Sequence, residues 1–308
     1  MTDSPASATP YEVLGVSAAA SQEELRRAYR KLARETHPDL GGSPERFRRV
    51  QLAWERIGTA EDRAAFDRGQ ATRTSQPAAP TSSWAPAAPR PTQQSRPRAR
   101  AYGHPGGRAR ELYLTLLREW VGRGEEIDDP YDPVLVRSAP GEIRRCLAKA
   151  LAEEATATTI TELGIGYTIW SDVAAGAEEK IDHVVLAPTG LYAIRSDDWG
   201  GTVTASRGEI VGEGVAVDEQ PVRALARSAR AFTKRTRVPF VAQLIVVPDD
   251  DLVDPVEPVS LGRRNSAFLV RRSVLAHVLR GGLTGGERTS SVDVFEIRSR
   301  LTHEVEFV

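Results

Sequence analysis

Apolar positions in the first 70 residues recur with the period of an α-helix. Two segments, residues 21–36 and 43–58, carry apolar stripes that would face each other in an antiparallel pair: Leu25, Ala28, Tyr29 and Leu32, then Phe47, Val50, Trp54 and Ile57. Ser21 with Glu24 forms a capping-box pattern, and Ser43 before a proline is a second helix start signal. We predict a helical hairpin, with a short helix from residue 10 before it and another, capped by Thr59, after it.

The pattern changes after residue 110, where helical and strand periodicities follow one another. Helices are predicted at 112–121, from Gly141, at 221–235 and at 272–280. Strands are predicted at 166–170, 181–187, 191–194, 201–205, 209–211, 240–247 and 267–270, with a hairpin turn at 188–190. The tail 291–308 is ambiguous, because its apolar spacing favours a helix up to Leu301 and a strand after it. This mixture predicts an α/β domain.

Residues 70–109 are rich in Pro, Ala, Ser, Thr and Gln and poor in large apolar side chains. Such a segment buries too little surface to offset the entropy of ordering, so we predict a disordered linker. The expected organisation is therefore multidomain: a flexible N-terminus at 1–8, an all-α module at 9–69, the linker at 70–109 and the α/β domain at 110–308. Arginines gather at the end of the linker: Arg90, Arg96, Arg98, Arg100, Arg108 and Arg110. These arginines either belong to a soluble spacer, which is the interpretation we favour, or make weak contacts with the phosphates of a nucleic acid.

Composition narrows the functional classes. The formal net charge of −1 gives no overall attraction to nucleic acid or to an anionic membrane. Cys146 is the only cysteine, so no intrachain disulfide or cysteine-based zinc site is expected, and we predict neither cofactor nor metal. We find no pattern of a signal peptide and no apolar stretch long enough to span a bilayer, so we expect a cytoplasmic protein without membrane contact.

The hairpin carries a candidate binding site at its turn. His37, Pro38 and Asp39 follow a helix whose surface is crowded with basic side chains: Arg26, Arg27, Arg30, Lys31 and Arg34. Proline stops the helix and stiffens the turn, so the histidine and the aspartate lose little entropy on docking. A basic helix face is often only a solvated surface, but beside this turn it favours steering onto an acidic partner. A general base or a metal ligand would be the rival roles for His37, but neither a nucleophile nor a second metal ligand stands at a recognisable spacing from it, so docking is preferred.

Several short motifs in residues 9–69 together resemble the J-domain of the DnaJ co-chaperone family. They are Tyr11-x-Val13-Leu14-Gly15-Val16, Tyr29-Arg30-Lys31-Leu32-Ala33, His37-Pro38-Asp39, Phe47 and Arg63-x-x-Phe66-Asp67. Trp54 stands where the family usually has tyrosine, and the loop after Asp39 is short. The resemblance implies that His37, Pro38, Asp39 and the basic face bind a DnaK-type chaperone and stimulate its ATPase.

A second resemblance, to the nuclease-related domain called NERD, covers residues 140–280. It is carried by Gly141-Glu142, Ile181-Asp182-His183-Val184-Val185, Pro188-x-Gly190 and Pro221-Val222-Arg223. It implies a restriction-endonuclease-like α/β/α fold in which a helix glutamate, an aspartate and a Glu-x-Lys pair serve a divalent metal. This chain keeps Glu142 and Asp182, but the Glu-x-Lys positions hold Arg195 and Asp197, and the following glutamine position holds Ala224. Both charges are reversed, which predicts a degenerate site without nuclease catalysis.

Because an unpaired buried carboxylate is costly, we hypothesise that Arg195 replaces the metal by pairing with Asp182 and with Glu142. The preferred function is then a J-domain co-chaperone, not an enzyme, whose C-terminal domain selects an unknown client or location. The alternative is a nucleic-acid-binding or metal-dependent nuclease-related protein. The client and the oligomeric state do not follow from the sequence.

Overall fold

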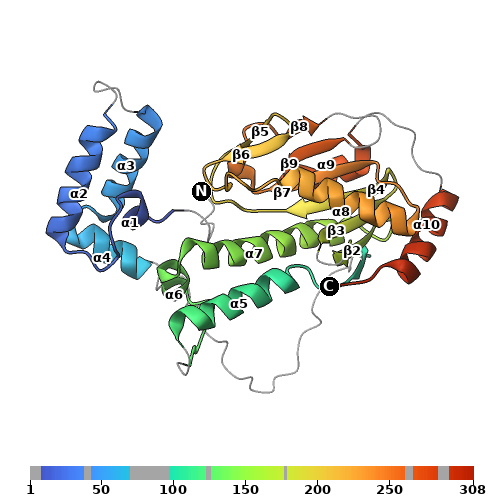
Figure 1. Ribbon diagram of the computed structural model, residues 1–308, viewed down its shortest axis with the longest axis horizontal. Helices are drawn as coiled ribbons and strands as arrows, with labels where there is room; N and C mark the ends of the chain where they lie inside the picture. The colour runs from blue at the N-terminus through green and yellow to red at the C-terminus, as the bar shows by residue number, and fades with distance from the viewer. Residues whose placement is uncertain are drawn as a thin grey trace, which may run out of the picture. The chain divides into compact units, whose positions relative to one another are not determined.

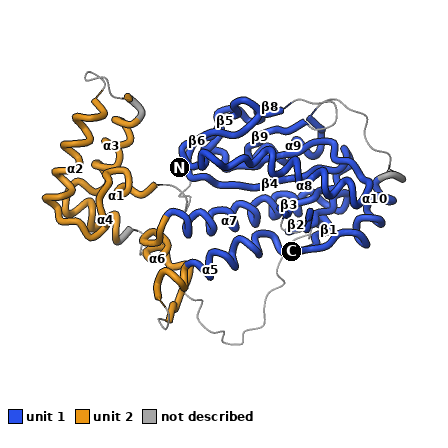
Figure 2. Tube along the Cα trace, viewed as in Figure 1, with its two compact units in different colours: residues 1–6, 91–116, 141–308 blue, residues 7–90, 117–140 orange. Residues whose placement is uncertain are grey.

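The computed structural model describes residues 8–37, 43–69, 97–122, 126–176, 179–260, 266–283 and 291–308. These residues fall into two compact units (Figure 2). One holds the described residues before position 70 together with 117–140; the other holds 97–116 and 141–308. The predicted division into a helical and an α/β part is thus confirmed, although the boundaries differ from those expected.

Among the described residues before position 70, four helices form the N-terminal module (Figure 1). They are α1 (Pro10–Val13), α2 (Gln22–Glu35), α3 (Pro44–Ile57) and α4 (Ala60–Gly69). The predicted start signals work as caps: Ser21 and Glu24 form a complete capping box at α2, and the Ser43 hydroxyl accepts the Arg46 N–H at α3. Thr59 Oγ1 accepts the Asp62 N–H at 3.0 Å and so caps α4.

The two predicted apolar stripes meet in the core of this module. The buried residues of this core are Leu25 of α2, Val50, Ala53 and Ile57 of α3, Tyr11 of α1 and Leu14, the residue that ends α1. Trp54, the departure from the family pattern, stacks on Tyr29 with ring centroids 4.4 Å apart. Arg63 on α4 joins α1 to its neighbours, since it donates to the Tyr11 hydroxyl and to the carbonyl of Ala20.

The second unit is built on a mixed seven-stranded sheet with the strand order β1-β2-β3-β4-β7-β9-β8. Its strands are β1 (Arg100–Tyr102), β2 (Thr168–Ala174), β3 (Lys180–Ala187), β4 (Gly190–Ser196), β7 (Ala242–Val247), β8 (Val256–Ser260) and β9 (Ala267–Arg271). A separate two-stranded ribbon contains β5 (Val203–Ser206) and β6 (Glu209–Gly212). The pairs β2–β3, β3–β4 and β8–β9 are antiparallel, whereas β1–β2, β4–β7 and β7–β9 are parallel.

Helices cover both faces of this sheet. The other helical elements of this unit are α5 (Gly107–Val121), which ends in the first unit, α7 (Gly141–Thr161), α8 (Pro221–Thr236), the 3₁₀ turn η2 (Asp249–Asp251), α9 (Arg272–Gly281) and α10 (Ser291–Glu304). The short helix α6 (Pro133–Ser138) belongs to the first unit. Alternate residues of β3 enter different cores: Val184 and Leu186 pack with α8 and α10, while Val185 and Ala187 pack with α7 and α9. The layers therefore form an α/β/α sandwich, as expected. Pro188 and Thr189 make the β3–β4 hairpin turn, and Gly190 follows it with a φ of 127°.

The end of the linker, the strands β1 and β8 and the helix α6 differ from the sequence-based expectations. The linker was expected to reach residue 109, but β1 lies within 97–109 and α5 starts at Gly107. The pattern of apolar residues did not indicate β1, because its three residues are exposed. The strand is fixed to the sheet by the buried Ala99 just before it and by backbone hydrogen bonds to residues 161 and 167. The edge strand β8 and the short α6 were also missed. The tail combines both expected forms, a helix to Glu304 and then a β-bridge from Phe307 to Val173.

The arginine cluster assigned to the linker is split by this fold. Arg100 donates to the Ile165 carbonyl at 3.2 Å, and Arg110 pairs with Glu154. Arg90 and Arg96 lie outside the described residues. Contact between this cluster and nucleic acid stays a prediction. Within the described part of the chain no helix is long and apolar enough to cross a membrane.

Candidate functional site

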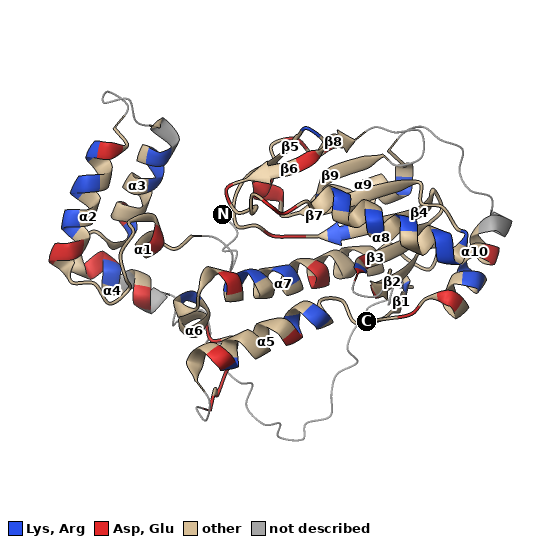
Figure 3. Cartoon of the chain, viewed as in Figure 1, with Lys and Arg blue, Asp and Glu red and all other residues tan. Residues whose placement is uncertain are grey.

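The first candidate site is the outer face of α2. Arg26, Arg27, Arg30, Lys31 and Arg34 are all exposed, and Figure 3 shows blue segments along this helix. Their spacing puts them on the side opposite Leu25, which is fully buried against α3. A shallow hollow of about 490 Å³ is lined by Arg27, Arg30, Lys31, Arg34 and Glu35. The only acidic residue lining it is Glu35, which lies 3.9 Å from the Lys31 ammonium group. The outer face of α2 is therefore an exposed, positively charged surface.

His37 lies at the C-terminal end of α2, next to this face. Its backbone N–H donates to the Arg34 carbonyl at 3.4 Å, and its ring meets the Phe47 ring edge-on with centroids 5.0 Å apart. The imidazole is thus held between the two helices of the hairpin rather than pointing freely into solvent. Pro38 and Asp39, the other two members of the predicted turn, lie outside the described residues.

The second candidate site surrounds Asp182 on β3. Its carboxylate is buried, and its Oδ2 accepts hydrogen bonds from Lys149 Nζ at 2.5 Å and from the Ser196 N–H at 2.9 Å. Its Oδ1 forms an ion pair with Lys180 Nζ at 3.4 Å. Burial alone would raise the pKa of Asp182, but the Lys149 and Lys180 ammonium groups outweigh it and hold that pKa well below its usual range. Asp182 is therefore ionised and held by two amines.

Glu153 on α7 belongs to the same cluster. Both of its oxygens lie 3.0 Å from Lys180 Nζ, and Oε2 also accepts the Gly106 N–H at 3.1 Å. Lys180 in turn reaches Asp172 Oδ1 at 2.5 Å. Complete burial raises the pKa of Glu153 to about 7; Asp182 adds to the rise while the two lysines oppose it. The same carboxylates raise the pKa of Lys180 above its ordinary value although burial would lower it.

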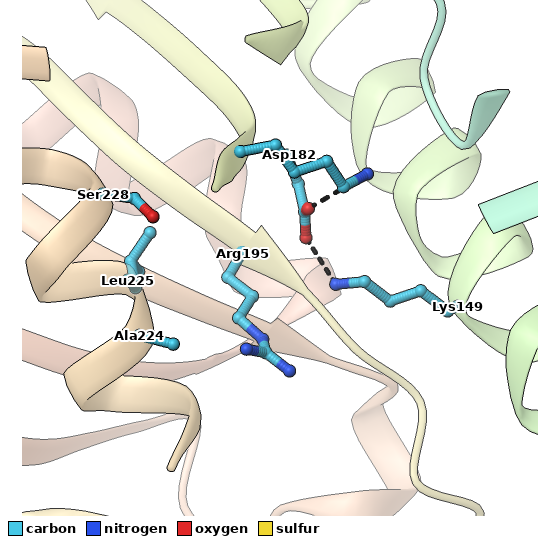
Figure 4. A pocket seen from close by; sticks show the side chains of 7 residues that line it. Lys149, Asp182, Arg195, Ala224, Leu225 and Ser228 are labelled. Carbon is cyan, nitrogen blue, oxygen red and sulfur yellow. Dashed lines mark hydrogen bonds and ion pairs between the residues drawn. The ribbon is translucent and has the colours of Figure 1, made fainter. Parts of the chain in front are cut away.

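Arg195 on β4 does not pair with Asp182, so our hypothesis about its partner is wrong. Its Nε donates to Asp197 and its Nη2 lies 2.8 Å from Glu219 Oε1, which also receives the Trp199 indole N–H. Asp182 and Arg195 do lie opposite each other on neighbouring strands, because the β3–β4 register that pairs His183 with Ile194 continues by one residue. Their side chains nevertheless have different partners. In Figure 4 both dashed lines end on Asp182 and neither reaches Arg195. The two reversed charges, Arg195 and Asp197, thus neutralise each other, and Lys149 and Lys180 hold Asp182.

Glu142 is not brought to this cluster. Its side chain is exposed in the first turn of α7, eleven residues before Glu153, which is about 16 Å along the helix axis. The helix glutamate that accompanies Asp182 is therefore Glu153, and the choice of Glu142 was wrong. The sequence held a usable signal: Lys149 and Glu153 are four residues apart, so both point from α7 to one side.

A small cavity of about 170 Å³ opens beside Asp182. It is lined by Lys149, Lys180, Asp182 and Arg195 from one side and by Ala224, Leu225 and Ser228 of α8 from the other (Figure 4). Ala224 was expected where nuclease-related proteins often carry glutamine, and it does line this cavity. An alanine offers no hydrogen bond to anything held here.

A nuclease with this fold would hold a divalent cation at this place, so the fit of the residues to such an ion can be tested. Hard cations need carboxylate oxygens with free lone pairs. Lys149 touches Asp182 and, at 3.1 Å, Asp197; Lys180 touches Glu153 and Asp172; Arg195 takes the second oxygen of Asp197. Within the described ranges no group of three or more His, Cys, Asp or Glu side chains is arranged to hold a metal ion. The cluster does not fit a divalent cation.

His183 lies next to Asp182 but belongs to the other face of the sheet. Its Nδ1 is 3.0 Å from Ser171 Oγ, and its buried Nε2 has no hydrogen-bond partner among the described residues. Burial lowers the pKa of His183 to about 4. A neutral, fully buried imidazole with one free nitrogen is a structural residue of the sheet rather than part of the cavity.

Comparison with known protein families finds a match over each of the two regions that hold these sites. Residues 9–67 match the DnaJ domain, and residues 148–256 match the Nuclease-related domain. The chain carries both domains. The nuclease-related match begins six residues after Glu142 and includes Glu153, Asp182, Arg195 and Asp197, which agrees with the geometry of the cluster.

Curated relatives match the DnaJ domain of this chain. The chaperone protein DnaJ of Trichodesmium erythraeum is 52% identical over 61 residues, which are 19% of this chain and 16% of that protein. The DnaJ protein homolog of Cucumis sativus is 49% identical over 57 residues, 18% of this chain and 14% of the relative. The chaperone protein DnaJ of Lactiplantibacillus plantarum is 48% identical over 60 residues, 18% of this chain and 16% of the relative. The chain thus covers only 14–16% of the length of these relatives.

Proposed function

We propose that this protein is a co-chaperone that stimulates ATP hydrolysis by a DnaK-type chaperone. The observation that carries the proposal is the exposed basic face of α2, which ends at His37 inside a segment that matches the DnaJ domain. The named relatives are DnaJ chaperones, and their similarity to this chain lies in that segment.

Two properties of this face suit it to a chaperone ATPase. Five exposed cations on one helix speed the approach to an acidic surface, and this effect weakens as salt rises. His37 is held against Phe47, so it loses little freedom when it docks. The DnaJ domain supplies no catalytic group in this scheme. It favours the conformation of the partner in which ATP is hydrolysed, because it binds that conformation better.

The nuclease-related domain acts in this proposal as a recognition module without nuclease catalysis. Its cluster holds two lysines and an arginine against the carboxylates that would be needed for a metal. A fold related to nucleases does not by itself imply their activity. The domain would select the client or the location to which the DnaJ domain brings its partner. Metal-dependent cleavage of nucleic acid by the full chain would contradict this part of the proposal.

The substitution His37→Gln tests the co-chaperone activity. Single-turnover ATP hydrolysis by a DnaK-type chaperone from the same cell is measured with and without the full chain. We expect the wild-type chain to accelerate hydrolysis and His37→Gln to lose most of that acceleration, about tenfold or more, because a docking group is removed.

His303→Gln is the matched control, since this histidine is exposed on α10 of the other domain. It should stimulate as the wild type does. Equal stimulation by His37→Gln and the wild type, or none by the wild type, would refute the proposal.

A further inference from the structure

The choice of basic residue in the cluster around Asp182 is unusual for this chain. Of its 41 basic residues, 37 are arginine and only four are lysine: Lys31, Lys149, Lys180 and Lys234. Two of those four lysines, Lys149 and Lys180, stand in this one cluster. Elsewhere in the sheet domain the exposed basic residues are almost all arginine, as on α8, where Lys234 is the exception. A lysine at both cluster positions therefore calls for a physical reason.

Each of these ammonium groups has all of its donors engaged by the protein. Lys149 Nζ donates to Asp182 and to the Ser196 carbonyl at 2.8 Å, and it lies 3.1 Å from Asp197. Lys180 Nζ faces Glu153 and Asp172, with Asp182 slightly farther away. An ammonium group has three donors, so neither lysine keeps one for a ligand. The cavity beside them is therefore not an anion site built on these amines.

Shape explains why lysine rather than arginine serves here. An ammonium group is a compact point charge, whereas a guanidinium is a planar fork that matches one carboxylate edge-on. Arg195 behaves in that second way, reaching Asp197 and Glu219 at the rim of the cluster. Lys180 sits among carboxylates of α7, β2 and β3, and Lys149 sits among acceptors of β3 and of the end of β4. A small metal cation occupies this kind of position.

We propose that the amines of Lys149 and Lys180 are the resident cations of this site, standing where a nuclease of this fold would hold its metal. The acidic cluster of α7, β2 and β3 is then assembled by the chain itself and needs no added divalent cation. This inference is independent of the co-chaperone proposal, because it concerns only the nuclease-related domain. Its test measures unfolding rather than ATP turnover, so the failure of either proposal can be recognised separately.

A charge-preserving substitution, Lys180→Arg, tests the need for a compact cation. Thermal unfolding of the full chain is followed by pulsed hydrogen exchange, which is read on peptides from α7 and β3. We expect the transition of these peptides to fall by about 10 °C, since a guanidinium cannot contact three carboxylates at this place. Lys234→Arg, the same change on the surface of α8, should leave it unchanged. An unchanged transition in Lys180→Arg would overturn the proposal.

Chemical rescue tests the identity of the cation. Lys180→Ala leaves room for a small cation, so added propylammonium should raise the transition of its α7 and β3 peptides, and the same amine should not affect Lys234→Ala. The wild type should unfold at the same temperature in magnesium, in manganese and in a chelator. Two results would overturn the proposal: no rescue of Lys180→Ala by the amine, or a metal-dependent rise in the wild type that Asp182→Asn abolishes. If Lys180→Ala does not fold alone, the recovery of folded protein with and without propylammonium decides in the same way.

Discussion

The two halves of this chain use positive charge in opposite ways. On α2 of the DnaJ domain the five basic side chains are exposed and separated from one another along one helix face. In the nuclease-related domain Lys149, Lys180 and Arg195 are largely buried, and every one of them contacts at least two carboxylates. The first arrangement keeps its interactions for a partner. In the second arrangement the positive charges are already paired with carboxylates inside the fold.

This difference predicts where a lost charge affects stability and where it affects binding. An exposed cation contributes little to folding, because water solvates it in both the folded and the unfolded chain. A buried ion pair is different, since removing one member leaves the other charged and unsolvated. The predictions below test this contrast, starting from the largest expected effect on the free energy of unfolding.

Asp182→Asn should be the most damaging of these changes. It removes the shared partner of Lys149 and Lys180 and leaves two buried amines with less compensation. We expect the free energy of unfolding of the nuclease-related domain to fall by about 3–5 kcal/mol. Denaturant unfolding followed by hydrogen exchange on β3 measures this loss. Asp218→Asn, at an exposed position, is the control and should change stability by less than about 0.5 kcal/mol. A similar loss in both variants would contradict the assigned role of Asp182.

The pH dependence of stability should separate two buried groups with opposite shifts. The pKa of Glu153 is raised to about 7, so it stabilises the fold at low pH and this contribution is lost as pH rises from about 4.5 to about 7. The pKa of His183 is lowered to about 4, so its contribution is present above about 6.5 and is lost as pH falls toward 4. Each contribution is roughly 3 kcal/mol over its range. In the wild type the two slopes largely cancel between pH 4.5 and 6.5.

Substituting either Glu153 or His183 should therefore change the slope of the free energy of unfolding against pH. Glu153→Gln removes the falling slope, so stability should rise more steeply with pH than in the wild type. His183→Gln removes the rising slope, so stability should fall as pH rises across the same range. Denaturant unfolding at several pH values measures both. Parallel profiles in all three proteins would show that these groups titrate alike in the folded and unfolded chains.

Arg30→Gln on α2 should have the smallest effect on stability. This side chain is exposed, so we expect the free energy of unfolding of the DnaJ domain to change by less than about 0.5 kcal/mol. If the proposed function holds, Arg30→Gln should stimulate the ATPase of a DnaK-type chaperone less than the wild type does. The difference between the two proteins should become smaller as salt is added, because the lost interaction is electrostatic. Arg230→Gln on α8 is the matched control for both measurements. A large loss of stability in Arg30→Gln would break the contrast between the two regions.

The DnaJ domain could be predicted closely because its signals are local. Helix caps, the proline turn and apolar spacing are all readable within a few residues, and the structure places α2 and α3 within one or two residues of the expected limits. The turn residue His37 and the basic face follow directly from their positions in the sequence. Such contacts link neighbours along the chain, which is why a single sequence carries them.

The cluster of the nuclease-related domain was predictable only in part, because its members come from distant segments. Asp182, Arg195 and Asp197 were singled out from the sequence and lie near one another, since Lys149 contacts both aspartates and Arg195 contacts Asp197, but their partners were not predicted. Lys149, Lys180 and Glu153 were not singled out from the sequence, and Glu142 was selected because it follows a glycine at a helix start. Which turn of a long helix faces a strand depends on tertiary packing, and no local pattern specifies it. The missed strand β1 has the same cause, since its partner β2 lies more than sixty residues away.

The outer edge of β2 has a consequence for the way this domain meets other chains. Residues 168–170 pair with β1, and residues 172–174 are covered by the tail, through the Val173–Phe307 bridge and backbone bonds at Asp172 and Ala174. An open strand edge is a template onto which a foreign extended segment can add. Two short pieces of chain, one from each side of the domain in sequence, close this one. Along these residues β2 therefore presents no open edge onto which a foreign extended segment could add.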